Sequence, residues 1–160
     1  MPGITALLHT ANDALRLGRA LETLRPCDEI LIVDHGSRDD TLRIAREYGA
    51  RILALAPGGS PTHYLQFAQQ DWILCLEPRE SLTEALEASL FEWKSKPRPQ
   101  RNGAAFSVLI REETPGGWIS LSSPQTRLIP RDWTSWNGHL PADHPSALVL
   151  EGELLRFRRP

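Results

Sequence analysis

One aliphatic run that ends in a carboxylate constrains this chain more than any other segment. Residues 29–33 read Glu-Ile-Leu-Ile-Val, and Asp34 follows them directly. Continuous runs of this kind are typical of parallel strands, which are buried on both faces. The turn-forming pair Gly36-Ser37 comes next, and Asp39 stands where a helix would begin. Because ligands of open α/β sheets bind at the carboxyl ends of strands, Asp34 is a candidate ligand contact.

The same alternation of strand and helix extends over the first 93 residues. Apolar runs predict strands at 4–9, 29–33, 51–55 and 72–76, and helical spacing predicts helices at 13–26, 39–48, 62–69 and 83–93. This βαβαβ(α)βα order implies a mostly parallel sheet with right-handed crossovers and helices on both faces. We expect Asn12 or Asp13 to cap the first helix and Gly49 to end the second.

The composition changes after residue 93. Residues 94–103 are basic and rich in Pro and Gly, which indicates an exposed connection. Beyond it we predict a hairpin of 104–111 and 118–121 and short strands at 126–129, 147–150 and 154–157. Too little chain follows the connection for a second core, so we expect residues 1–160 to form a single domain.

Composition and charge exclude several classes of protein. The 160 residues are 41% hydrophobic and 24% charged, as in ordinary globular proteins, and the net charge of −2 gives no reason to expect nucleic acid or an anionic membrane as partner. We recognise no signal peptide and no apolar run of membrane-spanning length, so we expect a cytoplasmic protein without a transmembrane segment. Cys27 and Cys75 have no metal-ligand spacing around them and are expected to be reduced, structural thiols.

Several segments carry a linked pattern in a fixed order. They are His9-Thr10-Ala11-Asn12, then Val33-Asp34-His35-Gly36-Ser37-Arg38-Asp39-Asp40-Thr41, then Ile44 to Ala50, and then Asp71-Trp72-Ile73-Leu74-Cys75-Leu76-Glu77-Pro78-Arg79-Glu80. In this pattern the first 90 or so residues resemble the family 2 glycosyltransferases of the GT-A fold, especially enzymes similar to bacterial lipopolysaccharide-core glucosyltransferases. Residues 126–129 and 136–138 resemble the family's Arg-Leu-Phe and Trp-x-Gly segments more weakly. The resemblance implies a GT-A-like three-layer α/β/α domain, with a nucleotide-binding half at 1–93 and a β-rich acceptor-side half at 104–160.

The resemblance also implies an activity and a donor site. Family members move a sugar from a nucleotide-diphospho-sugar to an acceptor hydroxyl with inversion, and a glycan or lipid-linked acceptor of the cell envelope is implied here. Thr10, Asn12, Asp34 and Asp39 are the candidates for nucleotide binding. Asn12 is equally a candidate helix cap, and Asp34 could instead fix the turn that follows it. Both interpretations stay open at this point.

The metal motif of the family is altered in this chain. The family's Asp-x-Asp pair holds a divalent ion such as manganese or magnesium, whereas this chain has Glu77-Pro78-Arg79. A guanidinium cannot ligate a cation, so we expect no metal here. Arg79 would either clamp the diphosphate or pair with Glu77 on the same strand face, and Arg127 is a further candidate for a phosphate contact. If the resemblance holds, Asp34 and Glu77 lie at the same carboxyl edge of the sheet.

The acceptor side offers two candidate bases and no way to choose between them. An inverting transfer needs a general base, and Asp143 or Glu151 could serve. His139 and His144 are predicted to be loop histidines. Three tryptophans suit either sugar stacking or the core, namely Trp118, Trp133 and Trp136. The main alternative to an active transferase is a degenerate, non-catalytic GT-A protein that binds a nucleotide or a protein partner.

Overall fold

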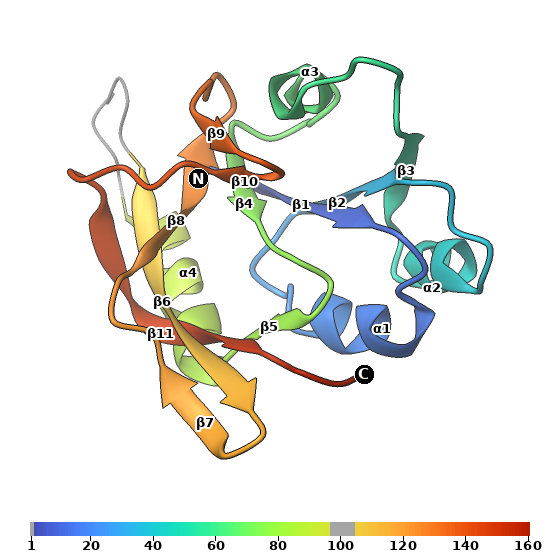
Figure 1. The fold of residues 1–160 in the computed structure, drawn as a ribbon. Coiled ribbons are helices and arrows are strands. Elements are labelled where there is room, and N and C mark those ends of the chain that lie inside the picture. Colours follow the sequence, from blue (N-terminus) through green and yellow to red (C-terminus); the bar gives the residue numbers. More distant parts are fainter. Residues whose placement is uncertain (1, 97–104) are drawn as a thin grey trace.

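The computed structural model describes residues 2–96 and 105–160, and one large mixed sheet runs through it (Figure 1). The strands are β1 (Ile4–Thr10), β2 (Glu29–Asp34), β3 (Arg51–Ala54), β4 (Trp72–Cys75), β5 (Glu80–Leu82), β6 (Phe106–Thr114), β7 (Gly117–Ser120), β8 (Gln125–Pro130), β9 (Trp136–Asn137), β10 (Leu140–Pro141) and β11 (Leu148–Arg156). The helices are α1 (Ala14–Glu22), α2 (Thr41–Glu47), α3 (Pro61–Leu65) and α4 (Glu84–Ser95). The large sheet has the order β3-β2-β1-β4-β8-β6-β11-β5, with β7 paired to β6, and β9 and β10 form a small separate sheet.

The first four predicted strands are parallel neighbours, as expected. β1 pairs with β2 on one side and with β4 on the other, and β3 flanks β2. Thr10 lies opposite Asp34 across the β1–β2 pair, and Leu7 lies opposite Cys75 across the β1–β4 pair. The carboxyl ends of these strands therefore meet at one edge. Asp34 ends β2 there and Glu77 follows β4 there, which confirms the prediction for these two carboxylates.

The second half of the chain extends the same sheet. β8 is antiparallel to both β4 and β6, so it joins the two halves edge to edge. The predicted hairpin is present as β6 and β7, and the predicted strand at 126–129 is β8. β5 and the short pair of β9 and β10 were not predicted, because segments of two or three residues carry too little pattern to be recognised.

β11 corrects one prediction. The segments 147–150 and 154–157, expected as two strands, belong to one strand that a β-bulge interrupts. Gly152 lies in this bulge with a φ of 93°, and a Cβ at that position would lie 2.3 Å from the backbone nitrogen of Leu86 in α4. Glycine therefore lets the helix approach the strand more closely than any other residue would.

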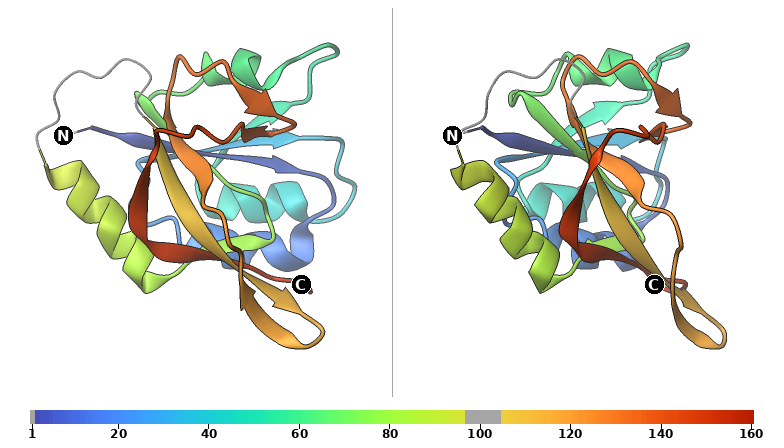
Figure 2. Two further views of the ribbon diagram at one scale, coloured as in Figure 1. Left: turned by 60° about the vertical axis from the view of Figure 1, so that its left-hand side comes forward. Right: turned by 90° about the vertical axis from the view of Figure 1, so that its left-hand side faces the viewer.

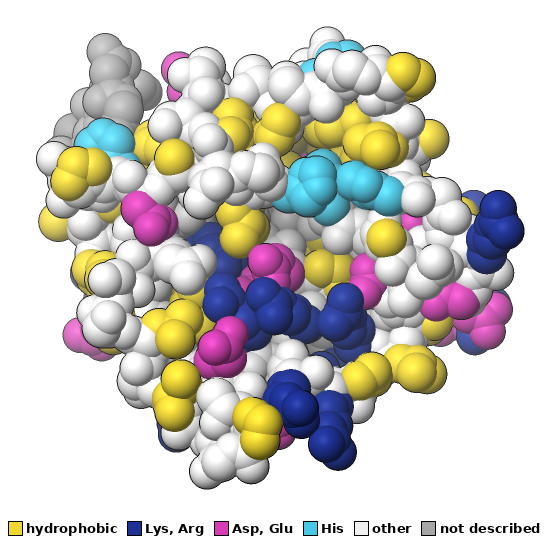
Figure 3. Space-filling model, in the orientation of Figure 1, with side chains coloured by type: hydrophobic (Ala, Val, Ile, Leu, Met, Phe, Trp, Pro, Cys, Tyr) yellow, Lys and Arg dark blue, Asp and Glu magenta, His cyan; other side chains and the backbone are white. Residues whose placement is uncertain are grey.

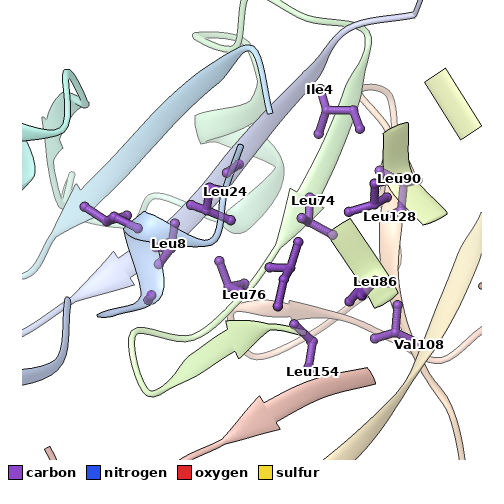
Figure 4. Close-up of a cluster of buried hydrophobic side chains, with 14 of the residues drawn as sticks. Ile4, Leu8, Leu24, Leu74, Leu76, Leu86, Leu90, Val108, Leu128 and Leu154 are labelled. Atoms are coloured by element: carbon purple, nitrogen blue, oxygen red, sulfur yellow. The ribbon is translucent and has the colours of Figure 1, made fainter. Parts of the chain in front are cut away.

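The helices cover the two faces of the sheet unequally. α1, α2 and α4 pack on one face, whereas short α3 lies on the other (Figure 2). Beneath the three helices, leucines from both sheet halves and from the helices meet in one buried cluster, shown in Figure 4 and including Leu8, Leu24, Leu74, Leu86 and Leu90. Burying each leucine side chain contributes about 1.5–3 kcal/mol, so this cluster is a major source of stability. Helices on both faces were predicted, and they are present.

The opposite face has a smaller core around α3. Tyr64 and Leu65 of this helix pack into a cluster with Trp133, which is 6% exposed. The core interpretation is therefore confirmed for Trp133. Trp136 is half-buried and donates its indole N–H to a hydroxyl oxygen of α3 at 2.7 Å. Trp118 is exposed and packs edge-on against a phenylalanine ring.

The predicted connection at 94–103 lies mostly outside the described residues. Its first part belongs to α4, which continues to Ser95. Lys94 is buried there and donates to a carboxylate oxygen of Asp28 at 2.8 Å and to the carbonyl of Pro26 at 2.9 Å. The expectation of an exposed connection is wrong for Lys94, because its ammonium finds two acceptors beneath the helix.

Two expectations from composition concern thiols and membrane helices. Cys27 and Cys75 carry free thiols, and burial raises the pKa of each to about 12, which makes them poor nucleophiles. Among residues 2–96 and 105–160, no helix has the length and apolar character needed to cross a membrane.

Candidate functional site

A hollow of about 340 Å³ opens at the carboxyl edge of the parallel strands. Its walls come from the end of β1 and the start of α1, from the residues after β2 and β4, and from β9 and β10. The lining residues are His9, Thr10, Ala11, Asp13, Arg16, His35, Leu76, Glu77, Pro78, Arg79, Asn137, His139 and Leu140. Figure 3 shows this face, with histidine side chains along one side and a group of Lys and Arg side chains below them.

Asp34 fixes the turn that leaves β2. Its Oδ1 accepts hydrogen bonds from the hydroxyls of Thr10 at 2.7 Å and Ser37 at 2.5 Å. Its Oδ2 accepts from the backbone N–H groups of Gly36 at 3.1 Å and Ser37 at 2.8 Å. Burial by itself would raise the pKa of Asp34, but the bonds from Ser37 and Thr10 outweigh it and lower that pKa. The structure thus favours the turn interpretation of Asp34, while Thr10 lines the hollow.

Asn12 and Asp39 connect the turn after β1 with the turn after β2 by hydrogen bonds. Asn12 has a φ of 55°, and its side-chain oxygen accepts from the backbone N–H of Arg38 at 2.8 Å. The N-cap of α1 is Asp13, so the cap interpretation of Asn12 is wrong. Asp39 accepts from the backbone N–H groups of Ala14 at 3.1 Å and Thr41 at 3.0 Å. Neither Asn12 nor Asp39 lines the hollow, and their nucleotide contacts stay a prediction.

Glu77 and Arg79 lie together in the turn after β4. The Nε of Arg79 donates to Oε2 of Glu77 at 2.6 Å, and both side chains are partly exposed in the wall of the hollow. The pairing that we considered is therefore present, although the two residues share a turn and not a strand face. A manganese or magnesium ion does not fit these residues. Arg79 stands where the family has its second carboxylate, and its guanidinium pairs with Glu77, which stands where the family has its first.

Arg127 does not face a phosphate. Its side chain is fully buried, and its Nη1 and Nη2 donate to the two carboxylate oxygens of Glu80 at 2.6 and 2.9 Å. Arg156 donates to the same carboxylate at 3.1 Å. Burial would raise the pKa of Glu80, but the charges of Arg127 and Arg156 more than compensate and lower it. The phosphate role predicted for Arg127 is therefore wrong. This arginine of β8 instead forms a buried ion pair with Glu80 of β5.

The two candidate bases lie away from the hollow. Asp143 is exposed, and its Oδ1 accepts from the backbone N–H of Thr126 at 3.0 Å. Glu151 is exposed beside the bulge of β11. Neither residue lines the hollow, so the geometry does not support either as general base. The sequence could not show this, because Asp143 lies in a loop and Glu151 lies in the bulge of β11, and the direction of each depends on distant contacts.

Sequence reasoning missed the histidines of the hollow and one of its arginines. His9 Nδ1 lies 2.9 Å from His35 Nε2, and the ring of His139 stacks on that of His9 with centroids 4.1 Å apart. Burial, then the neighbouring His139 and His35, lower the pKa of His9 to about 3, so its ring is neutral near pH 7. Arg16 lines the hollow and pairs with Asp13 at 2.6 Å. The position of two of these histidines could have revealed them, since His9 and His35 lie at the carboxyl ends of neighbouring parallel strands.

Comparison with known proteins supports a glycosyltransferase-like protein. No model of a known protein family matches the chain. It is 33% identical over 91 residues to an uncharacterized glycosyltransferase of Rickettsia felis, a match that covers 54% of this chain and 32% of that protein. It is 35% identical over 127 residues to a TPR repeat-containing protein of Synechococcus elongatus, covering 76% of this chain and 30% of that protein. The chain thus spans about a third of the length of these relatives.

The fold agrees with the sequence matches. A crystal structure of Staphylococcus aureus TarS 1-349 superposes with a TM-score of 0.50 at 20% identity, covering 77% of this chain and 38% of that one. The chain has a GT-A-like α/β fold and is a glycosyltransferase-like protein. The predicted fold class is therefore confirmed.

Proposed function

We propose that the hollow binds a nucleotide-diphospho-sugar and that the protein transfers the sugar to an acceptor hydroxyl with inversion. One observation carries the proposal: two arginines, Arg16 and Arg79, line a hollow at the carboxyl edge of the parallel strands in a GT-A-like fold. Ligands of open α/β sheets bind at this edge. A diphosphate there needs positive charge, and the two guanidinium groups supply it where the family's divalent ion would not fit.

Both arginines keep donors available for an anion. Arg79 uses its Nε toward Glu77, and neither of its Nη atoms has a hydrogen bond to a described residue. Arg16 directs its Nε and Nη2 to Asp13, which leaves its Nη1 without such a bond. The two side chains are 40% and 35% exposed, so a phosphate could reach them from solvent. Arginine donors of this kind bind phosphate oxygens by charge-assisted hydrogen bonds.

We propose that this binding needs neither manganese nor magnesium. The donor would be a nucleoside diphosphate sugar, and the acceptor a glycan or a lipid-linked group. The unreactive thiols of Cys27 and Cys75 fit the reducing cytoplasm that we propose as location. Because the predicted bases lie outside the hollow, a second candidate is a GT-A protein that binds the nucleotide without transferring the sugar.

Nucleotide binding is tested by thermal shift and calorimetry with uridine, guanosine and thymidine diphosphates, each with and without manganese. We expect one of them to raise the melting temperature equally in both conditions, because a ligand that binds only the folded state stabilises it. Arg79→Ala should weaken the diphosphate by about 1.5–3 kcal/mol and leave the nucleoside unaffected. Arg43→Ala is the matched control, since Arg43 is an exposed, paired arginine on α2 outside the hollow.

Three outcomes would contradict the proposal. They are no shift with any diphosphate at millimolar concentration, a shift that requires manganese, and equal losses in Arg79→Ala and Arg43→Ala. Transfer is separated from binding by following release of the nucleoside diphosphate from the matching sugar nucleotide and the anomeric configuration of any product. Binding without release over hours would favour the non-catalytic candidate.

A further inference from the structure

Three histidines from distant parts of the chain gather at one side of the hollow. His9 belongs to β1, His35 follows β2, and His139 lies between β9 and β10. One ring nitrogen of each lies within 4.8 Å of the corresponding atoms of the other two. No other group of three or more potential metal ligands is present among residues 2–96 and 105–160. Imidazole nitrogens brought together in this way suit a transition-metal ion.

The backbone places two of the three histidines next to each other. His9 lies opposite Val33 in the β1–β2 pair, and the N–H of His35 donates to the carbonyl of Thr10 at 2.8 Å. Both side chains are half-buried, and His9 Nδ1 and His35 Nε2 are 2.9 Å apart. Two nitrogens that bind one zinc ion at about 2.0–2.1 Å in a tetrahedral site lie roughly 3.4 Å apart. A small outward movement of either ring would therefore admit the ion between them.

The third ring would have to turn. His139 stacks on His9 with an angle of 15° between the ring planes, and coordination uses lone pairs that lie in those planes. Two stacked rings therefore cannot both direct a nitrogen at one ion. His139 is exposed and follows Gly138, whose φ is 66°, so its side chain has room to rotate without disturbing the core.

The positive charge near the histidines is partly offset. Arg16 and Arg79 line the same hollow, and each is paired with a carboxylate, Asp13 and Glu77 respectively. The ligand set contains nitrogen only, which favours zinc over the oxygen-preferring manganese and magnesium.

We propose that His9, His35 and His139 form a zinc site at the mouth of the hollow. Three protein ligands leave the fourth tetrahedral position open, and all three histidines line the same hollow as Arg16 and Arg79. Water or an oxygen of an anionic ligand could occupy it. The site is distinct from the altered position at 77–79 and does not rest on the binding of a nucleotide.

The test is calorimetric titration of the chelator-treated full chain with zinc chloride alone. We expect one zinc ion per chain with micromolar or tighter affinity, and no heat from magnesium. His35→Ala and His139→Ala should each weaken zinc by at least about tenfold. His63→Ala is the matched control, because His63 is exposed on α3 outside the group. Cobalt(II) adds a spectroscopic readout, since a tetrahedral nitrogen site gives visible absorption that the two variants should lose.

The proposal is overturned if zinc binds with only millimolar affinity, or if His63→Ala weakens it as much as the other variants do. It is also overturned if His35→Ala and His139→Ala both bind zinc as the original protein does. Because His139 is exposed, its removal should leave folding intact, and far-ultraviolet circular dichroism checks this for each variant. Nucleotide titrations on zinc-free protein separate this result from the proposed function, since either can fail without the other.

Discussion

The buried ion pair of Glu80 and Arg127 gives the sharpest test of what stabilises this fold. Glu80 and Arg127 are both fully buried, and the carboxylate also accepts from Arg156 at 3.1 Å and from the backbone N–H of Glu77 at 2.9 Å. Glu80→Ala removes the acceptor and leaves the guanidinium of Arg127 buried without a counter-charge. The strands concerned, β5, β8 and β11, come from both halves of the chain.

The size of the effect follows from this burial. Removing one partner of a buried ion pair costs about 3–5 kcal/mol, because the remaining charge stays desolvated. For a domain of this length that loss corresponds to a fall of roughly 6–20 °C in melting temperature. Replacing both partners by apolar residues removes the uncompensated charge of Arg127, and Arg156 keeps Glu112 as a partner at 3.2 Å. Glu80→Leu with Arg127→Met should therefore cost clearly less than Glu80→Ala alone.

Urea unfolding followed by tryptophan fluorescence measures these free energies of unfolding. Glu92→Ala serves as control, because the exposed pair of Glu92 and Lys96 should contribute little. If Glu80→Ala lowers the free energy of unfolding by less than about 1 kcal/mol, the reasoning is refuted, since an unpaired buried guanidinium destabilises a fold by more than that. A double variant that is no more stable than the single one would refute it equally.

Two further predictions concern single positions. Gly152→Ala should lower the free energy of unfolding by about 2 kcal/mol or more, since its Cβ would meet the backbone of α4 at 2.3 Å and its φ is 93°. Gly116→Ala is the control, because a Cβ at that position would meet nothing closer than 4.0 Å. Equal stabilities of the two variants in urea would contradict the close packing at Gly152. The folded-state pKa of Asp34 is lowered. The stability that its carboxylate contributes is therefore fully present above the usual carboxyl pKa of about 3.9 and is lost as pH falls through the lowered value. The free energy of unfolding, measured between pH 7 and pH 2, should therefore depend less on pH in Asp34→Asn than in the original protein. An unchanged pH dependence would exclude the hydrogen bonds to Asp34 as its source.

The parallel half of the fold could be predicted from the sequence because its signals are local. Each aliphatic run and each helical spacing lies within about fifteen residues, and the right-handed crossover rule then places neighbouring strands side by side. The shared edge of Asp34 and Glu77 follows directly from that arrangement. The sequence also offered a pairing of Arg79 with Glu77 as one of two interpretations, and this ion pair is present in the structure.

The remaining features depend on contacts between distant residues. Arg127 was assigned to a phosphate because its partner, Glu80, is 47 positions away and belongs to a three-residue strand. The bulge at Gly152 depends on the approach of α4, which no pattern in β11 reveals. His139 joins His9 and His35 only after β9 and β10 have turned back over the edge of the sheet, so residue type alone indicated a loop histidine.

The position of β8 has a consequence for how the chain reaches its native state. β4 is the last strand of the parallel half, and the strand that pairs with its outer edge is β8, whose residues lie more than fifty positions later. Until β8 arrives, the backbone groups of Trp72 to Leu74 offer an open template to which another chain could add a strand. Pairing over so long a separation is slow, because the loop must close before the contacts form. During synthesis, the parallel half of the sheet would therefore be the part most exposed to aggregation.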